Sequence, residues 1–587
     1  MTHSYTLHTL FQHIKAQKKE FWRTNVFGIL STLTLLPLPI LIPMLIDEVL
    51  LGHPGKITEF ITAVFGQSEV WVYISMVLIS VVILRFIAFG FTNTKTFYAT
   101  KLTQKISYLL RHSILHHLER VSISEYETLN SGGVASKTVQ DVQTVSGFAS
   151  MLVTTLLSAS LMVIGVAVIM IWMNWVLALL VFTLNPFFLA FSRIIGKTTS
   201  ALLRRQNEAY ELYHDALNET LELFIQVRAS NQERNFFGLI QLRAKEIEKA
   251  SVDYGYKASV AHASSALLTT TVVDVFRALG IAAVAYSDLS IGMMLAFLFY
   301  LSTIVAPIQQ LMSLIITYQS TKPAFTRINS LLALHHEPHY PHEANPFANI
   351  YSTSMELKNV SFAYREGNPV LSNISLKAEA GQKIALIGSS GSGKSTIAQI
   401  MVGFYPSNSG AVLYGDSPIE KIGLPVVREN VALMLQQSLF FNDTIRMNLT
   451  LSSEKTDDEI YAALRAAQLE DFVTRLQNGL NSRIGKNGIR LSGGQRQRLA
   501  IARLILSDPK IVIFDESTSA LDNETEYNLY ETLGEFLKER TAVIIAHRRT
   551  TIKQADYIYL IANGKVIHEG TFDEMEAKGM IKEDFDV

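Results

Sequence analysis

The chain has 587 residues, of which 49% are apolar and 18% are charged, and its formal net charge is −1. A charged share below the roughly 25% of soluble domains, with no excess of positive charge, argues against nucleic acid as a partner. The absence of cysteine excludes disulfides, thiolate catalysis and cysteine metal sites.

The N-terminal stretch is polar and rich in lysine, so it lacks the pattern of a cleavable signal peptide. Residues 11–24 ("FQHIKAQKKEFWRT") predict an amphipathic helix lying on the inner membrane surface. A basic tail without regular structure is the alternative interpretation.

Long apolar segments follow and predict six membrane-spanning helices. These segments are residues 24–46, 70–84, 142–192, 258–287 and 289–321. Residues 142–192 carry no charge for 51 residues, which is enough for two crossings of roughly 20 residues each. Within them "IWMNW" (171–175) is the natural turn, because tryptophan suits a membrane interface.

The distribution of lysine and arginine predicts the orientation of these helices. Positive residues gather in 95–141 and 193–257, whereas 47–69 holds one lysine and the turn at 287–289 holds only Asp288. Under the positive-inside rule both termini lie in the cytoplasm. The basic stretches have helical patterning with few Gly or Pro, so they are expected to extend the membrane helices into the cytoplasm.

The fifth apolar segment carries two charges, Asp274 and Arg277, which share one helix face at a spacing of three residues. A charge at the centre of the bilayer costs roughly 2.5–3.5 kcal/mol, so such residues face a partner or a cavity. The pair is interpreted either as an internal ion pair or as part of a translocation pathway for a charged headgroup. Arg85 in the second segment is a further candidate partner, or extends toward the interface.

A polar linker over residues 326–354 contains "HHEPHYPHE" (335–343). Its four histidines permit zinc binding as one interpretation. A solvated linker is the favoured one, because two prolines interrupt any fixed ligand geometry.

The segment "KIALIGSSGSGKSTIAQIMVG" (383–403) reads as a buried strand, a glycine-rich loop and a helix. This context confirms the pattern G-x-x-x-x-G-K-[ST] as a phosphate-binding P-loop. Backbone N–H groups of such a loop surround the β-phosphate, Lys394 neutralises the β- and γ-phosphate oxygens, and Ser395 binds Mg²⁺. The nucleotide-binding candidates are Gly388, Ser389, Ser390, Gly391, Ser392, Gly393, Lys394, Ser395 and Thr396.

Two further motifs follow the P-loop. "IRLSGGQRQRLA" (489–500) predicts a glycine turn opening a helix, where the Ser492 hydroxyl and the N–H groups of Gly493 and Gly494 favour an anion. "KIVIFDES" (510–517) predicts a buried strand ending in two acids. Asp515 is placed to hold the Mg²⁺ shell, and Glu516 to polarise an attacking water.

Together these motifs make residues 355–587 resemble the nucleotide-binding domain of an ATP-binding-cassette (ABC) transporter. "LSGGQ" (491–495) is the signature sequence of that family. Family members pack two cassettes head to tail, with each ATP between the P-loop of one subunit and the signature of the other. The resemblance therefore implies a dimer, with ATP and Mg²⁺ as its ligands.

The resemblance also assigns roles to single residues. Tyr364 matches the aromatic residue that stacks on adenine, and Gln436 matches the glutamine that touches Mg²⁺. His547 matches the histidine that contacts the γ-phosphate. Gln495 is the last residue of the signature. Asp522 in "SALD" (519–522) matches the loop that communicates between the two ATP sites. Lys486 in "GKNG" replaces the glutamate usual in exporters, which implies either an altered partner loop or a different mode of coupling and leaves the hydrolytic chemistry unchanged.

The membrane half resembles half-transporter exporters, including lipid flippases and multidrug or peptide pumps. The matching features are "NSGGVASKTVQDV" (130–142), Gly292, Pro307 and Arg327. By the same resemblance, residues 122–128 and 207–217 are expected to be short coupling helices that dock on the cassettes.

The fold expected is multidomain. An all-α polytopic membrane domain (1–325) has six transmembrane helices with long cytoplasmic extensions. The linker (326–354) and an α/β P-loop ATPase cassette with a helical signature subdomain (355–587) follow it.

The function expected is that of an ATP-hydrolysing exporter or flippase of the bacterial inner membrane. It would move an amphiphilic lipid, drug or peptide out of the cytoplasm or the inner leaflet by alternating access, as a homodimer. One half of a heterodimer and an exporter-shaped siderophore importer are the alternatives closest to it. An ATP-gated channel and a soluble ATPase of the DNA-repair type are more distant alternatives.

Overall fold

A computed structural model gives the structure of the chain. It describes all residues except 1–4, 53–54, 56–57, 60–61, 64–68, 130–133, 136, 287–289, 349, 366, 436–437, 516–533, 547 and 582–587, and except the side chains of 180–200, 262, 265, 269, 272, 283, 486 and 550. The chain forms two compact units. The helical unit comprises Met1–Leu118 and Asn130–Ala333, and the sheet unit comprises Glu119–Leu129 and Leu334–Val587. The domain limits expected at residues 325 and 355 stay predictions.

The described part of the helical unit is built from helices. They are α1 (Leu7–Ala16), α2 (Lys18–Leu35), α3 (Leu38–Leu45), the π-helix η1 (Ile46–Leu50), α5 (Val70–Leu118), the π-helix η2 (Lys137–Asp141), α8 (Val142–Met173), α9 (Trp175–Glu222), α10 (Phe224–Ala229), α11 (Glu233–Tyr286) and α12 (Ile291–Leu332). Five stretches in the described residues are long and apolar enough to cross a membrane: Lys18–Leu50, Val70–Leu118, Lys137–Met173, Glu233–Tyr286 and Ile291–Leu332. A sixth crossing, by α9, stays a prediction.

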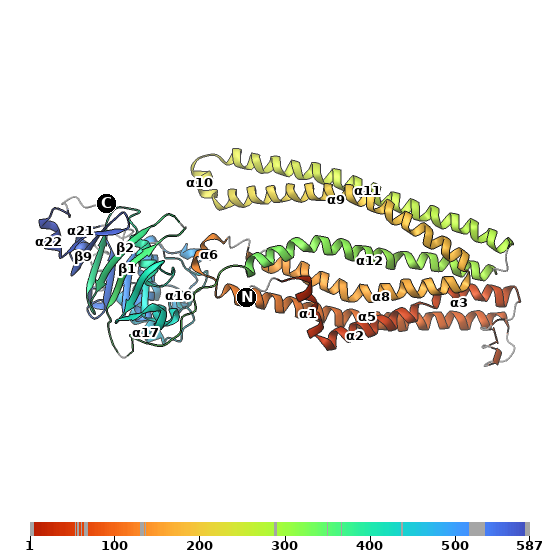
Figure 1. Cartoon of the computed structure of the whole chain (residues 1–587), viewed down its shortest axis with the longest axis horizontal. Coiled ribbons are helices and arrows are strands. Elements are labelled where there is room, and N and C mark those ends of the chain that lie inside the picture. The colour runs from red at the N-terminus through yellow and green to blue at the C-terminus, as the bar shows by residue number, and fades with distance from the viewer. Residues whose placement is uncertain are drawn as a thin grey trace. The chain divides into compact units, whose positions relative to one another are not determined.

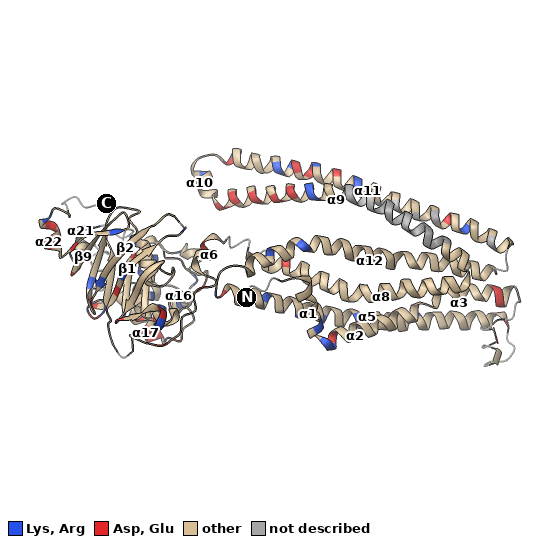
Figure 2. Ribbon diagram, viewed as in Figure 1, with Lys and Arg blue, Asp and Glu red and all other residues tan. Residues whose placement is uncertain are grey.

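The charged residues lie mainly outside the middle of the apolar helices. Figure 2 shows few charged residues along the middle of α5, α8 and α12, and many along the parts of α9 and α11 that adjoin α10. The predicted turn between the third and fourth segments is confirmed: α8 ends at Met173 and Asn174 caps α9. The Asn174 side-chain oxygen accepts hydrogen bonds from the N–H groups of Val176 (3.1 Å) and Leu177 (3.0 Å).

The predicted continuous helix over 11–24 is wrong, because the chain breaks at Gln17 between α1 and α2. Leu10 and Ile14 are buried in the helical unit, so α1 packs its apolar face against protein. Just before α1, the Tyr5 N–H donates to the Asn329 side-chain oxygen of α12.

Helices α2, α3, α5, α8 and α12 pack together, and α9 and α11 lie side by side as a pair joined by α10 (Figure 1). The expectation of a short helix over 207–217 is wrong, since these residues lie inside the continuous helix α9. The break comes later, where α10 is followed by Asn231 in a left-handed conformation (φ 52°). The short helix in this part of the chain is therefore α10, which follows the end of α9.

The beginning of α12 is fixed by a close contact with η1. The Ser290 side chain caps α12 by accepting from the Met293 N–H (3.1 Å) and donates to the Asp47 carboxylate, which also accepts from the Gly292 N–H (2.8 Å). A Cβ at Gly292 would approach the Asp47 carboxylate and the Pro43 carbonyl oxygen closer than 3.0 Å. Glycine is therefore required for this approach.

A bidentate ion pair ties η2 to the other end of α12. Arg327 donates to Asp141 through Nε (2.9 Å) and Nη2 (2.6 Å), and Asp141 is 4% exposed. A bidentate pair of this kind adds geometric specificity to its energy.

We expect Asp141→Asn to destabilise the helical unit by about 1–3 kcal/mol, because the buried site would lose its charge-assisted hydrogen bonds. Thermal unfolding of the purified protein measures this as a lower Tm. Glu246→Gln is the matched control, since Glu246 forms a solvent-exposed pair with Arg243 one turn away on α11 (2.8 Å). Equal Tm values for the two variants would contradict the prediction.

The sheet unit contains two sheets. An antiparallel sheet has the order β2 (Leu371–Ala378), β1 (Met355–Phe362), β4 (Ser409–Tyr414), β5 (Ser417–Pro418). A second sheet has the order β10 (Lys565–Gly570), β9 (Tyr557–Ala562), β3 (Lys383–Ile387), β8 (Thr541–Ile545), β7 (Ile511–Asp515), β6 (Val431–Met434). All its neighbouring strands run parallel except the antiparallel edge strand β10.

The helices that the structure describes in the sheet unit pack against hydrophobic cores. They are α6 (Ile123–Thr128), α13 (Lys394–Met401), α14 (Ile419–Ile422), α15 (Leu424–Asn430), α16 (Ile445–Thr450), α17 (Asp457–Ala466), α18 (Glu470–Thr474), α19 (Gly493–Ser507), α21 (Arg549–Ile552) and α22 (Phe572–Ala577). Helix α13 packs into the core between the two sheets. Helices α16, α17 and α19 form a separate helical core with β6 and β7. The expected helical subdomain around the signature is confirmed.

Candidate active site

The P-loop joins β3 to α13, as its sequence predicts. Strand β3 is buried, and its glycine-rich continuation has left-handed φ angles at Gly391 (78°) and Gly393 (104°). A Cβ at Gly393 would come within 2.6 Å of the Leu371 side chain. The loop therefore needs glycine both for its backbone angles and for its close packing on β2.

Lys394 lies inside the curve of this loop. Its Nζ donates to the carbonyl oxygens of Gly388 (2.8 Å) and Ser389 (2.9 Å), and the residue is only 6% exposed. These contacts hold the ammonium at the first turn of α13, where helix N–H groups also favour an anion. The neighbouring Ser395 is exposed on the same turn.

Strand register places Asp515 level with the end of the P-loop strand, with one strand between them. Asp515 pairs with Ile545 of β8, and Ile545 pairs in turn with Leu386 of β3. Because neighbouring parallel strands lie about 4.8 Å apart, the carboxyl ends of β3, β8 and β7 form one row. Ligands of open α/β sheets bind at this edge.

Four predicted site residues lie outside the described residues: Gln436, Glu516, Asp522 and His547. In sequence, Glu516 directly follows the last residue of β7, and His547 comes two residues after the end of β8. Their roles stay predictions.

Tyr364 lies over the P-loop helix. Its hydroxyl donates to the Gln399 side-chain oxygen (3.0 Å) and lies 3.1 Å from the Thr396 hydroxyl, both on α13. Its ring meets those of Phe362 (4.9 Å between centroids) and Tyr405 (5.1 Å) edge to face. The Tyr364 side chain is about half exposed, so it remains accessible to a ligand.

The signature opens α19 with a capping box, which confirms that the glycine turn begins a helix. The Ser492 hydroxyl accepts from the Gln495 N–H (3.2 Å), and the Gln495 side chain accepts from the Ser492 N–H (2.9 Å). Gly493 and Gly494 are the first two residues of the helix. This helix and the P-loop helix pack into different cores.

Arg503 is a partly buried cation on α19 that no sequence motif indicates. Its Nε donates to the Asn448 carbonyl oxygen (2.7 Å), and its guanidinium lies 4.8 Å from the centre of the Phe440 ring. Burial lowers the pKa of Arg503 from its ordinary value. The contacts tie the signature helix to residues 440–448.

The short helix expected over residues 122–128 is present as α6. Helix α6 belongs to the sheet unit, and Ile123 packs against the core between the sheets. The Glu127 carboxylate accepts from the Tyr405 hydroxyl (2.6 Å), and Glu125 pairs with His335 (2.5 Å).

Further linker residues make protein contacts. Glu337 forms a bidentate pair with Arg428, and the His342 ring nitrogen lies 2.9 Å from the Ile422 carbonyl oxygen. Within the part of the chain that the structure describes, no group of three His, Cys, Asp or Glu residues has a metal-binding arrangement.

In the helical unit, Asp274 and Arg277 form the expected ion pair (2.8 Å) along one face of α11. Both side chains are more than half exposed, so the pair lies on the surface of the single chain. Arg85 is exposed on α5.

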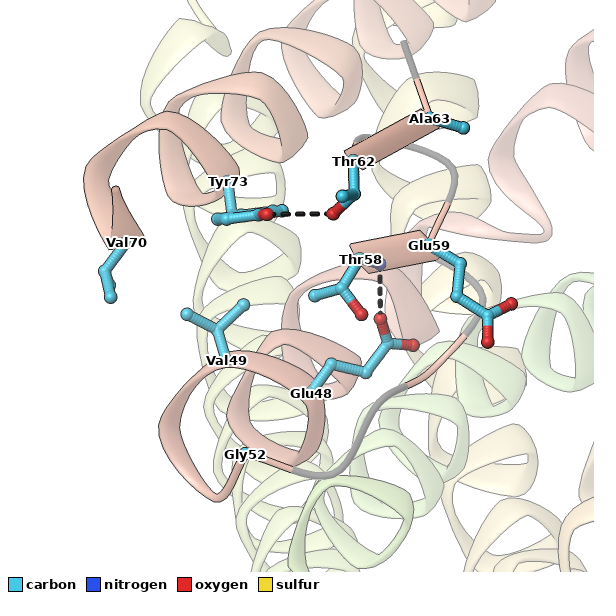
Figure 3. A pocket seen from close by; sticks show the side chains of 9 residues that line it. All are labelled: Glu48, Val49, Gly52, Thr58, Glu59, Thr62, Ala63, Val70 and Tyr73. Carbon is cyan, nitrogen blue, oxygen red and sulfur yellow. Dashed lines mark hydrogen bonds between the residues drawn. The ribbon is translucent and has the colours of Figure 1, made fainter. Parts of the chain in front are cut away.

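The helical unit also has an open cavity of about 550 Å³ beside η1 and the start of α5 (Figure 3). The Glu48 carboxylate accepts from the Thr58 N–H (2.7 Å), and the hydroxyls of Thr62 and Tyr73 lie 2.9 Å apart. These bonds order the cavity wall, and none of its residues belongs to a nucleotide motif.

Two family models match the chain. The model of the ABC transporter transmembrane region matches residues 26–308, and the ABC transporter model matches residues 371–519. The first covers the helices α2 to α12, and the second covers the P-loop, the signature and Asp515.

Similar proteins cover most of the chain. An ATP-dependent lipid A-core flippase of Saccharophagus degradans is 32% identical over 527 residues, covering 88% of this chain and 87% of the relative. A flippase of the same name from Alcanivorax borkumensis is 30% identical over 81% of both chains. A putative multidrug export ATP-binding/permease protein of Bacillus subtilis is 27% identical over 96% of both.

A solved structure of a bacterial Atm1-family ABC exporter with ATP bound has the same fold. It superposes with a TM-score of 0.79 at 23% identity and covers 98% of both chains. The chain therefore belongs to the ABC transporter family, as a half-transporter that joins a transmembrane region and one ATP-hydrolysing cassette in a single polypeptide.

Proposed function

We propose that this half-transporter works as a homodimeric exporter or flippase of the bacterial inner membrane, moving an amphiphilic lipid, drug or peptide out of the cytoplasm or inner leaflet. The observation that carries the proposal is a P-loop and a signature helix on one chain that anchor in different cores of the cassette. One cassette then offers two half-sites, and a second copy completes both.

In each composite site the P-loop (388–396) of one copy would hold the ATP phosphates, and Tyr364 would stack on adenine. Ser395, Gln436 and Asp515 would hold Mg²⁺, with Glu516 and His547 acting at the γ-phosphate. The partner copy would contribute Ser492, Gly493, Gly494, Gln495 and, through its loop, Asp522. Mg²⁺ would neutralise the charge that develops during phosphoryl transfer.

Exposed apolar side chains support the dimer. The tip of the α9–α11 pair exposes Ile225 (82%) and, to a lesser extent, Leu221 and Phe224. The cassette exposes Leu439 (69%) and Phe441 (62%) just after the predicted Gln436 position. Exposed apolar patches of this kind mark protein–protein contacts. The tip of one copy would dock on the cassette of the other.

The names of the relatives and the exposed Asp274–Arg277 pair support an amphiphilic cargo with a charged headgroup. The pair and Arg85 would then line the cargo pathway, which polar groups in membrane segments commonly do. Both termini and the cassette would lie in the cytoplasm.

The test is transport by the purified chain reconstituted alone into phosphatidylethanolamine–phosphatidylglycerol vesicles. We expect Mg²⁺- and ATP-dependent movement of a fluorescent lipid, a cationic dye or a labelled peptide, away from the leaflet that carries the cassettes. The Lys394→Ala variant is the control that cannot use ATP. Movement toward the cassettes would support import instead. ATP binding without turnover in the chain alone would contradict the homodimer.

A further inference from the structure

A chain of side-chain contacts connects helix α6 to Tyr364 within the sheet unit. It begins at Glu127 on α6, whose carboxylate accepts the hydrogen bond of the Tyr405 hydroxyl at 2.6 Å. The Tyr405 ring then meets the Tyr364 ring at 5.1 Å, with an angle of 86° between the ring planes. In sequence, α6 lies in the loop between the second and third membrane segments. The contacts therefore link that loop to the tyrosine at the proposed adenine position.

The middle member of this chain is held firmly. Tyr405 is 4% exposed and also packs against Phe362, with 5.5 Å between ring centroids. Burial, together with the hydrogen bond to Glu127, raises the pKa of Tyr405 above its ordinary value. Its hydroxyl consequently stays protonated and serves as the donor to the carboxylate. Closely packed protein interiors transmit displacements from one side chain to the next.

The last member of the chain is tied to the phosphate-binding helix. Tyr364 donates to Gln399 at 3.0 Å, and its hydroxyl lies 3.1 Å from that of Thr396. Both partners lie on α13, which begins at Lys394. The tilt of the Tyr364 ring is thus set by α13 and by the rings of Phe362 and Tyr405. The Tyr405 contact alone depends on α6.

We propose that Tyr405 is a positioning residue that sets the Tyr364 ring according to the position of α6, so that the affinity for ATP depends on the Glu127–Tyr405 hydrogen bond. The inference rests on the proposed adenine role of Tyr364. From Tyr364 the contacts continue to Thr396 and Gln399 of α13, and neither of these side chains is proposed to act at the γ-phosphate. Loss of the hydrogen bond therefore acts on KM for ATP and leaves kcat nearly unchanged.

The experiment compares the ATPase kinetics of Tyr405→Phe and Glu127→Ala in lipid nanodiscs. We expect KM for ATP to rise about three- to tenfold in each variant, with kcat within about twofold of the original. Each variant removes the same hydrogen bond, so the effects of the two substitutions are coupled. For the same reason the double variant should be no worse than either single variant. Glu127→Gln should restore KM, since an amide oxygen still accepts the hydrogen bond.

Glu125→Ala is the matched control. Glu125 lies on the same helix but pairs with His335, and no hydrogen bond joins it to Tyr405 in the described structure. Its KM should stay unchanged, which separates the hydrogen bond from the general stability of α6. Additive effects in the double variant, or unchanged KM in both single variants, would overturn the inference.

Tyr364→Ala distinguishes failure of the inference from failure of the adenine role. If that variant raises KM while Tyr405→Phe and Glu127→Ala do not, the adenine role stands and the positioning role is wrong. If Tyr364→Ala leaves KM unchanged, the adenine role is wrong and the inference falls with it.

Discussion

Replacing Glu516 with glutamine is expected to lower kcat for ATP hydrolysis by roughly 10²- to 10⁴-fold, which is what a positioned general base contributes. The amide has the shape of the carboxylate but cannot accept a proton from the attacking water. Glu516 follows Asp515 at the carboxyl end of β7, in the strand row that includes the P-loop strand. The measurement is Mg²⁺-dependent phosphate release by the chain in nanodiscs, beside the unaltered protein.

ATP binding separates this variant from Lys394→Ala. Glu516→Gln should still bind ATP, because the loop that surrounds Lys394 is unaltered, whereas Lys394→Ala should lose binding together with turnover. Cargo movement should stop in both variants. Transport that continues in Glu516→Gln would contradict ATP-driven export, and turnover that continues would exclude Glu516 as the base.

The nucleotide half of the molecule could be predicted in detail because its motifs have local causes. The P-loop needs glycines at fixed intervals, and the structure has left-handed angles at Gly391 and Gly393. The signature needs a hydroxyl cap and a glutamine three residues later, and Ser492 with Gln495 forms that capping box. Such features depend on a few consecutive residues, so the sequence alone predicts them.

In the membrane half, only the features that follow from the hydropathy of the sequence could be predicted. The turn at Asn174 follows from its position between two apolar runs. The short helix α10 could not be predicted in the same way. Residues 207–217 have the charged composition of a surface loop, yet they are good helix formers and continue α9. The turn that ends the following helix α10 depends on Asn231, a residue without a strong signal of its own.

Contacts between residues that are far apart in the sequence could not be predicted, for a different reason. Asp141 and Arg327 are separated by 186 residues, and Glu127 and Tyr405 by 278. In each case the residue type is common at a helix end or in a core, so the partner decides its role. The topology of the folded chain is what brings these pairs together.

Gly388→Ala is expected to lower the stability of the cassette strongly. Gly388 extends β3 alongside β9 with φ at 149°, and a Cβ there would approach the Ile561 carbonyl oxygen closer than 3.0 Å. Backbone strain and overpacking each cost about 1–3 kcal/mol, and neither the strand nor the backbone oxygen can move cheaply. The variant should therefore unfold at a clearly lower Tm and bind ATP poorly.

Gly391→Ala is the control, because Gly391 shares the left-handed conformation (φ 78°) but has no atom within 4 Å of an added Cβ in the described structure. It should lose only the roughly 1–2 kcal/mol of backbone strain. A Tm drop at least twice as large for Gly388→Ala would mean that close packing of β3 on β9 shapes the loop. Equal drops would mean that the backbone angle alone requires glycine, and that the P-loop has room to relax beside Ile561.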